Sequence, residues 1–164
     1  MSHPVAEDRP VDHGDALNLI RSAIAEAPGP GAAAQKAVDV LHERFSHYDW
    51  IGVYWVDVNG TDLVLGPWTG PEATEHTRIP IGVGICGAAA ASGQTEIVDD
   101  VNADPRYLAC FTTTRSEIVV PIFAEGSVVG EIDIDGSDLA AYDQTDANFL
   151  EEIAALLAPL RPRP

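Results

Sequence analysis

The period of the hydrophobic and polar positions changes twice along this chain. Up to about residue 47 the apolar residues recur every three or four positions, which is typical of amphipathic helices. Between residues 50 and 135 they alternate or form short runs, which is typical of strands. The helical period returns after residue 142. The pattern therefore predicts helices at both ends of the chain and a sheet between them.

Two helices are predicted before residue 50. Asp12 or Asp15 is suited to cap the first one, which ends at the Pro/Gly segment 28–31. The apolar face of the first helix consists of Leu17, Ile20 and Ile24. The apolar face of the second consists of Ala34, Val38, Leu41 and Phe45. Both faces are explained by core packing alone.

The middle of the chain predicts two β-hairpins and a set of shorter elements between them. Asn59-Gly60 and Gly126 mark the two hairpin turns. The strands of the hairpins are predicted over 50–58 and 62–68, and over 116–125 and 127–135. The intervening elements are a strand at 77–81, a helix within 82–93, a strand at 95–100 and a polar loop at 102–114. With a last helix over 143–157, we expect an α+β fold, in which helices pack on one face of an antiparallel sheet.

Composition narrows the class of protein. A chain of 164 residues with 46% hydrophobic content is sufficient for one domain, which we expect over 12–160 after a flexible N-terminus of residues 1–11. No apolar stretch approaches the ~20 residues of a membrane span, and the polar start does not resemble a signal peptide. We therefore expect a cytoplasmic protein. A net charge of −17 argues against nucleic acid or an anionic membrane as a partner.

Candidate chemistry is concentrated between residues 82 and 135. This region contains both cysteines, Cys86 and Cys110, and Glu117 near the start of a predicted strand. Asp133 and Asp135 are two positions apart on a strand and therefore share one face. The histidines and cysteines show no zinc-ligand spacing, so we expect neither a metal nor a cofactor. A lone cysteine is often only a small buried hydrophobe, and strand carboxylates often only face solvent.

Several segments in a fixed order resemble one protein family. They are DWIGVY, LVLGPWTG, TRIPIGVGICGAAA, YLAC, RSEIVVP and GEIDID. In this order the chain resembles GAF domains and, more narrowly, the free methionine-(R)-sulfoxide reductases. The resemblance implies a single GAF-like domain with a loop-covered pocket, and an enzyme that reduces free L-methionine (R)-sulfoxide. It also implies recycling by a thioredoxin-like dithiol donor, and a homodimer is compatible with it.

The resemblance also assigns roles by position. Cys110 corresponds to the nucleophile, Cys86 to a second family cysteine, and Trp50 to an aromatic residue of the methyl pocket. The carboxylates that hold the substrate correspond to Glu117, Asp133 and Asp135. The family commonly has a third, resolving cysteine just before TRIP, where this chain has His76 or Thr77. Either Cys86 or an external thiol then resolves the oxidised nucleophile, or the activity is lost.

The proposed chemistry suits these residue types. A thiol attacks the sulfoxide sulfur, becomes a sulfenic acid and is resolved by a second thiol. Crowded carboxylates raise at least one pKa, which supplies a proton donor, and the remaining carboxylates can pair with the α-ammonium group. A helix N-terminus is expected to lower the pKa of Cys86, whereas neighbouring carboxylates keep Cys110 protonated. Thiol pKa alone therefore favours Cys86 as nucleophile, whereas the resemblance favours Cys110.

Two functions without this reaction are consistent with the same residues. One is a GAF ligand-binding module that binds a small molecule and performs no chemistry, as the missing third cysteine suggests. The other is a redox sensor in which Cys86 and Cys110 form a switch disulfide.

Overall fold

The computed structural model describes residues 9–109 and 111–163, with side chains from residue 12 onward. The strands form one six-stranded sheet in the order β3-β2-β1-β6-β5-β4, and all neighbouring strands are antiparallel. Their bounds are β1 Trp50–Val56, β2 Asp62–Thr69, β3 Arg78–Pro80, β4 Glu96–Val98, β5 Ser116–Ala124 and β6 Ser127–Gly136. The expected antiparallel α+β fold is confirmed.

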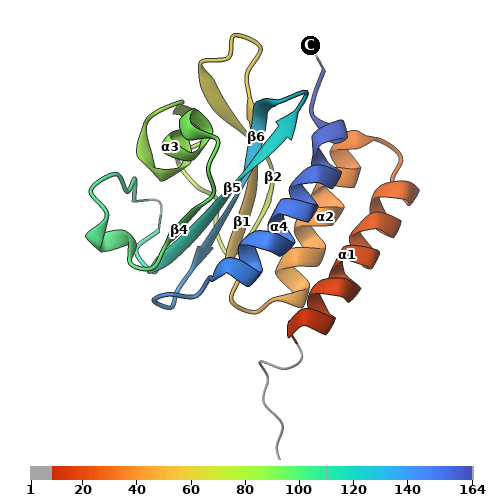
Figure 1. Ribbon diagram of the computed structural model, residues 1–164, viewed down its shortest axis with the longest axis horizontal. Coiled ribbons are helices and arrows are strands. Elements are labelled where there is room, and N and C mark those ends of the chain that lie inside the picture. The colour runs from red at the N-terminus through yellow and green to blue at the C-terminus, as the bar shows by residue number, and fades with distance from the viewer. Residues whose placement is uncertain (1–8, 110, 164) are drawn as a thin grey trace, which may run out of the picture.

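Within the described residues, α2 and α4 pack on one face of the sheet, α1 packs outside them on α2, and α3 lies on the other face (Figure 1). The helices are α1 Arg9–Glu26, α2 Pro30–Arg44, α3 Gly84–Ser92 and α4 Gln144–Leu157. Short 3-10 turns follow β4 at Val101–Ala103 and α4 at Ala158–Leu160. None of the helices in the described part of the chain is both long and apolar enough to cross a bilayer.

The helix boundaries differ from the sequence-based prediction at two places. Helix α1 begins at Arg9, so Asp12 lies within its first turn, and neither Asp12 nor Asp15 caps it. Pro30 and Gly31 belong to α2 rather than to the connecting segment, because proline at the first helical position lacks only an N–H that would be unpaired there. Residues 9–11 of the expected flexible segment 1–11 belong to α1, and the flexibility of residues 1–8 remains a prediction because they lie outside the described part.

Side-chain alternation along the central strands produces two separate cores. On the helical face, Ile132 and Ile134 of β6 join a large cluster with residues of α2 and α4. On the opposite face, Trp50 and Tyr54 of β1 and Val119 of β5 join a smaller cluster with α3. The smaller cluster is where the polar residues of β5 and β6 are also buried. One face of the sheet therefore carries the large apolar core, whereas the face under α3 also carries the buried polar side chains that could take part in a reaction.

The N-terminus of α4 is held by a polar network that predicts a measurable stability effect. The Tyr48 hydroxyl donates to Asp146 Oδ1 at 2.7 Å, and the Asp143 N–H donates to Asp146 Oδ2 at 3.0 Å. Burial by itself would raise the pKa of Asp146, but His47, Tyr48 and the Asp143 N–H together lower it. We expect Asp146→Ala to reduce the free energy of unfolding by about 2–4 kcal/mol, because it removes the capping box and leaves the buried Tyr48 hydroxyl without its acceptor.

The sign of the pH dependence follows from this lowered pKa. The Asp146 contribution is present above about pH 4, the ordinary Asp value, and is lost as the pH falls through the lower folded value. Urea unfolding of wild type and Asp146→Ala should therefore differ at neutral pH and converge in acid. Asn148→Ala, on the exposed face of α4, is the control and should change stability by less than about 0.5 kcal/mol. Equal effects of the two variants would contradict the prediction.

Candidate active site

Strand β6 carries three buried carboxyl groups on the same face. Glu131, Asp133 and Asp135 alternate with Ile132 and Ile134, and their exposed fractions are 0%, 4% and 4%. The shared face of Asp133 and Asp135 was predicted from the strand period. Glu131 was missed, although the same alternation in GEIDID indicates it. Three carboxyl groups removed from water on one strand are unusual, because burial of an unpaired charge is costly.

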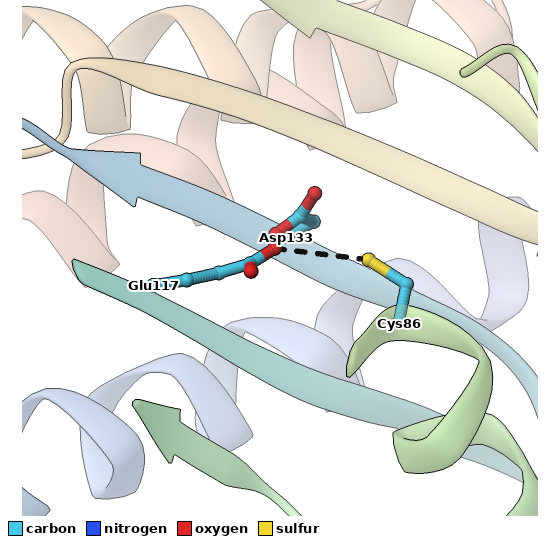
Figure 2. Close-up of side chains that lie close together, drawn as sticks. All are labelled: Cys86, Glu117 and Asp133. Atoms are coloured by element: carbon cyan, nitrogen blue, oxygen red, sulfur yellow. Dashed lines mark hydrogen bonds between the residues drawn. The ribbon is translucent and has the colours of Figure 1, made fainter. Parts of the chain in front are cut away.

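Glu117 and Cys86 complete the cluster from two other elements. Glu117 lies on β5, where it is the register partner of Asp135 on β6. Cys86 lies in the first turn of α3, and its thiol donates to Glu117 Oε2 over a long Sγ–O distance of 3.9 Å. The Cys86 sulfur and one oxygen each of Glu117 and Asp133 lie within 4.8 Å of one another. Figure 2 shows these three side chains converging between α3 and the sheet.

The pKa of the Cys86 thiol is shifted in the opposite direction to the sequence-based prediction. Burial raises its pKa well above the ordinary value, and the negative charges of Asp133, Glu131, Glu117 and Asp135 raise it further. The expected lowering by the helix N-terminus is therefore wrong for Cys86. The thiol is only 6% exposed and points at carboxylates, and these effects outweigh the helix dipole. Cys86 is a protonated thiol in the resting protein.

The carboxyl groups of β6 also hold their protons more strongly than usual. Burial raises the pKa of Asp133. Burial and then the charge of Asp133 raise the pKa values of Asp135 and Glu131 well above their ordinary range. The expectation that crowding raises at least one carboxyl pKa is confirmed. The cluster can therefore hold a carboxylic acid beside a carboxylate, which is the arrangement that a proton donor requires.

Two small cavities lie over this face of the sheet. One, of about 20 Å³, is lined by Cys86, Glu117 and Asp133 together with apolar residues such as Leu108. The other, of about 30 Å³, is lined by Trp50, Asp135 and Phe111, among others. Each has room for about one or two water molecules. The predicted pocket is therefore present in a closed form.

Two aromatic side chains, Trp50 and Phe111, line part of the second cavity. Trp50 stacks on Trp68 with ring centroids 6.1 Å apart, and Phe111 lies 5.9 Å from Trp50. The indole N–H of Trp50 donates to the Glu72 carbonyl at 3.2 Å. Sequence analysis identified Trp50 but not Trp68 or Phe111, which come from other strands and loops. These aromatic rings lie beside Asp135 and form an aromatic wall. A ligand that carries a small alkyl group next to a cationic group would match this arrangement, with the alkyl group on the rings and the cation at the carboxylate.

Described residues of the loop at 102–114 line both cavities: Leu108 lines the first, and Phe111, Thr113 and Thr114 line the second. Tyr107, Leu108 and Phe111 are half-buried against the smaller core. His76 is half-buried, and its Nε2 lies 3.2 Å from the Ala109 carbonyl oxygen. The predicted nucleophile Cys110 lies outside the described residues. Its role as the nucleophile therefore stays a prediction.

Close packing at Gly52 predicts a local effect on the aromatic wall. A Cβ atom at Gly52 would lie 2.3 Å from Trp50 Cη2, so the indole occupies the space that any side chain there would need. We expect Gly52→Ala to displace Trp50 and destabilise the fold by about 1–3 kcal/mol, with a changed tryptophan emission spectrum. Gly14→Ala is the control, because a Cβ there meets nothing within 4 Å. An unchanged spectrum and stability in Gly52→Ala would refute this account.

Known proteins resemble this chain over most of its length. Residues 30–159 match the GAF domain model. Protein YtsP of Bacillus subtilis is 39% identical over 118 residues, which cover 72% of this chain and 71% of that protein. The free methionine-R-sulfoxide reductase of Escherichia coli is 34% identical over 118 residues, which cover 72% of this chain and 69% of that protein.

A solved structure extends the similarity to almost the whole fold. It is the free methionine-R-sulfoxide reductase of Neisseria meningitidis in complex with its substrate. The TM-score is 0.87 at 41% identity, and the match covers 98% of this chain and 94% of that one. The chain therefore belongs to the GAF domain family, in the group that contains the free methionine-R-sulfoxide reductases.

Proposed function

We propose that this protein reduces free L-methionine (R)-sulfoxide to methionine. The observation that carries the proposal is the buried cluster of Cys86, Glu117 and Asp133, with Asp135 beside an aromatic wall. It occurs in a chain that is 41% identical to a reductase whose structure was solved with its substrate. A buried acidic cluster beside apolar rings suits a ligand with an ammonium group at one end and a methyl sulfoxide at the other.

The carboxylates provide the selectivity for a free amino acid. Asp133 and Asp135 are oriented to the same side of β6 and are both almost fully buried, so they can accept charge-assisted hydrogen bonds from an α-ammonium group. A peptide nitrogen carries no charge and would leave these carboxylates unpaired, which is costly. Trp50, with Trp68 and Phe111, would contact the methyl group. The reductase therefore selects the free amino acid by charge and the methyl sulfoxide by shape.

The thiol chemistry is assigned to Cys110. Its sulfur attacks the sulfoxide sulfur, the oxygen is transferred to give Cys110 sulfenic acid, and methionine leaves as the thioether. A protonated carboxyl group of the cluster, for which Glu117 is the candidate, donates to the sulfoxide oxygen during the attack. A second thiol then condenses with the sulfenic acid and releases water to form a disulfide. That thiol is Cys86 or an external one, because the usual third cysteine is replaced near His76 or Thr77.

Turnover requires a reductant and a motion. A thioredoxin-like dithiol donor reduces the disulfide, which places the protein in a reducing compartment such as the cytoplasm. Cavities of about 20 and 30 Å³ are too small for the amino acid, so the 102–114 loop moves to admit it. A homodimer is compatible with this scheme.

The deciding test couples the protein to thioredoxin, thioredoxin reductase and NADPH. We expect NADPH consumption with free methionine (R)-sulfoxide, and little or none with the free (S)-sulfoxide or a peptide-bound sulfoxide. Equal rates with the peptide would contradict selection by the carboxylates. Binding of methionine without turnover, under any thiol reductant, would assign the ligand-binding module instead.

A further inference from the structure

The cluster beneath α3 has the donor atoms of a metal site as well as those of a substrate pocket. One sulfur and two carboxylate oxygens, from Cys86, Glu117 and Asp133, lie within 4.8 Å of one another. The three residues are only 4–6% exposed and come from α3, β5 and β6. Donors on regular elements around a buried core are held more firmly than donors on loops. The arrangement was not visible as a spacing in the sequence because the three elements are far apart in the chain.

The separations suit one tetrahedral ion. Zinc lies about 2.3 Å from thiolate sulfur and about 2.0–2.2 Å from carboxylate oxygen, so neighbouring donors of a tetrahedral site are about 3.3–3.6 Å apart. The Cys86 Sγ to Glu117 Oε2 distance is 3.9 Å, and the whole set lies within 4.8 Å. Small side-chain rotations therefore bring all three donors to one ion. Figure 2 shows the side chains of Cys86, Glu117 and Asp133 pointing toward one another.

A second observation indicates that the cluster needs a cation. Asp133 Oδ1 is buried and has no hydrogen-bond partner among the described residues, and Asp133 lines the 20 Å³ cavity with Cys86 and Glu117. Both oxygens of the fully buried Glu131, two positions away on the same face, also lack a partner among those residues. An unpaired buried carboxylate oxygen is costly, and a cation bound between Cys86, Glu117 and Asp133 would satisfy Asp133 Oδ1. The cavity has room for a water as the fourth ligand.

We propose that Cys86, Glu117 and Asp133 form a Zn²⁺ site that excludes the free amino acid. Zinc replaces the Cys86 thiol proton, which is released to solvent, and forms a bond to the thiolate. The thiolate favours zinc over the hard ions Mg²⁺ and Ca²⁺. Because Asp133 would also contact the substrate ammonium, zinc and amino acid compete for it. The competition rests on the proposed function, whereas the binding of zinc does not.

Cobalt is the probe for the site, because a thiolate bound to Co²⁺ absorbs in the near ultraviolet. We expect the reduced full-length protein to show this thiolate-to-cobalt band and to bind one zinc ion per chain by equilibrium dialysis. Cys86→Ser should remove the band, and Asp133→Asn should weaken zinc binding at least about tenfold, which is the lower end of the loss when only an outer-shell partner of a metal ligand is removed. Cys110→Ser is the matched control and should retain the band.

The outcomes separate this inference from the proposed function. If the thiolate-to-cobalt band survives in Cys86→Ser, the ion is bound elsewhere and the proposed site is wrong. The same conclusion follows if the band disappears in Cys110→Ser. Circular dichroism verifies that the variants are folded, and Asp133→Asn provides a second variant of nearly unchanged size. Added methionine should weaken zinc binding; if it has no effect, exclusion of the amino acid is wrong. Methionine binding without any zinc binding would overturn the zinc site and leave the reductase proposal intact.

Discussion

We expect replacement of Cys110 by serine to abolish reduction of free methionine (R)-sulfoxide with every reductant, because a hydroxyl group cannot take up the sulfoxide oxygen as a thiol does when it becomes a sulfenic acid. Cys86→Ser, in contrast, loses turnover with thioredoxin but retains some with a small thiol, which can resolve the sulfenic acid directly. The expected loss for Cys110→Ser is complete within the detection limit of the coupled assay. Normal turnover in Cys110→Ser would show that another group is the nucleophile.

The fate of the sulfenic acid distinguishes the two thiols. Cys86 is a buried thiol beside Glu117 with a raised pKa, so it would need a base in order to resolve the oxidised nucleophile. Mass spectrometry after treatment with substrate but no reductant measures the product. An intramolecular disulfide supports resolution by Cys86, and a sulfenic acid trapped by dimedone supports an external thiol. An absence of modification at both cysteines would remove the catalytic assignment.

Asp133→Asn and Asp135→Asn are expected to raise KM for the free amino acid about ten- to hundredfold. Each removes a charge-assisted hydrogen bond to the ammonium group, which contributes ~1.5–3 kcal/mol. The same changes should leave the midpoint of thermal unfolding unchanged or higher, because the wild-type carboxyl groups are buried and each has an oxygen without a partner among the described residues. Steady-state kinetics and thermal unfolding of the same preparations test both parts.

The matched control is Asp138→Asn, which makes the same chemical change at an exposed position just after β6. We expect neither KM nor stability to change in this variant. An unchanged KM in both Asp133→Asn and Asp135→Asn would rule out the ammonium contact. A large loss of stability in either one would show that the carboxylate has a structural role.

Much of the local structure was predictable because local physics determines it. The turn at Asn59-Gly60 formed as predicted, and Gly60 has the positive φ of 73° that glycine adopts readily. Asp143 caps α4 through hydrogen bonds to the N–H groups of Thr145 and Asp146. The two-residue period of β6 places Asp133 and Asp135 on one face. These features depend on neighbours within a few positions, so the sequence alone identifies them.

The composition of the site depended on contacts between distant segments. Cys86 and Glu117 are 31 positions apart and meet because α3 packs on β5 and β6. Strand β1 pairs with both β2 and β6, a sheet order that no local pattern encodes. Trp68 and Phe111 join Trp50 only in the folded chain.

The charge state of Cys86 shows most clearly the difference between what the sequence determines and what the tertiary structure decides. The sequence alone determined that this thiol starts a helix, and from that position a lowered pKa was expected. Only the tertiary structure decided that the thiol is buried against four carboxyl groups, which raise the pKa instead. Period, turn and cap are properties of a short segment, whereas desolvation and Coulomb interaction depend on every group that packs around an atom. Chemistry at this site is therefore a property of the fold rather than of the motif.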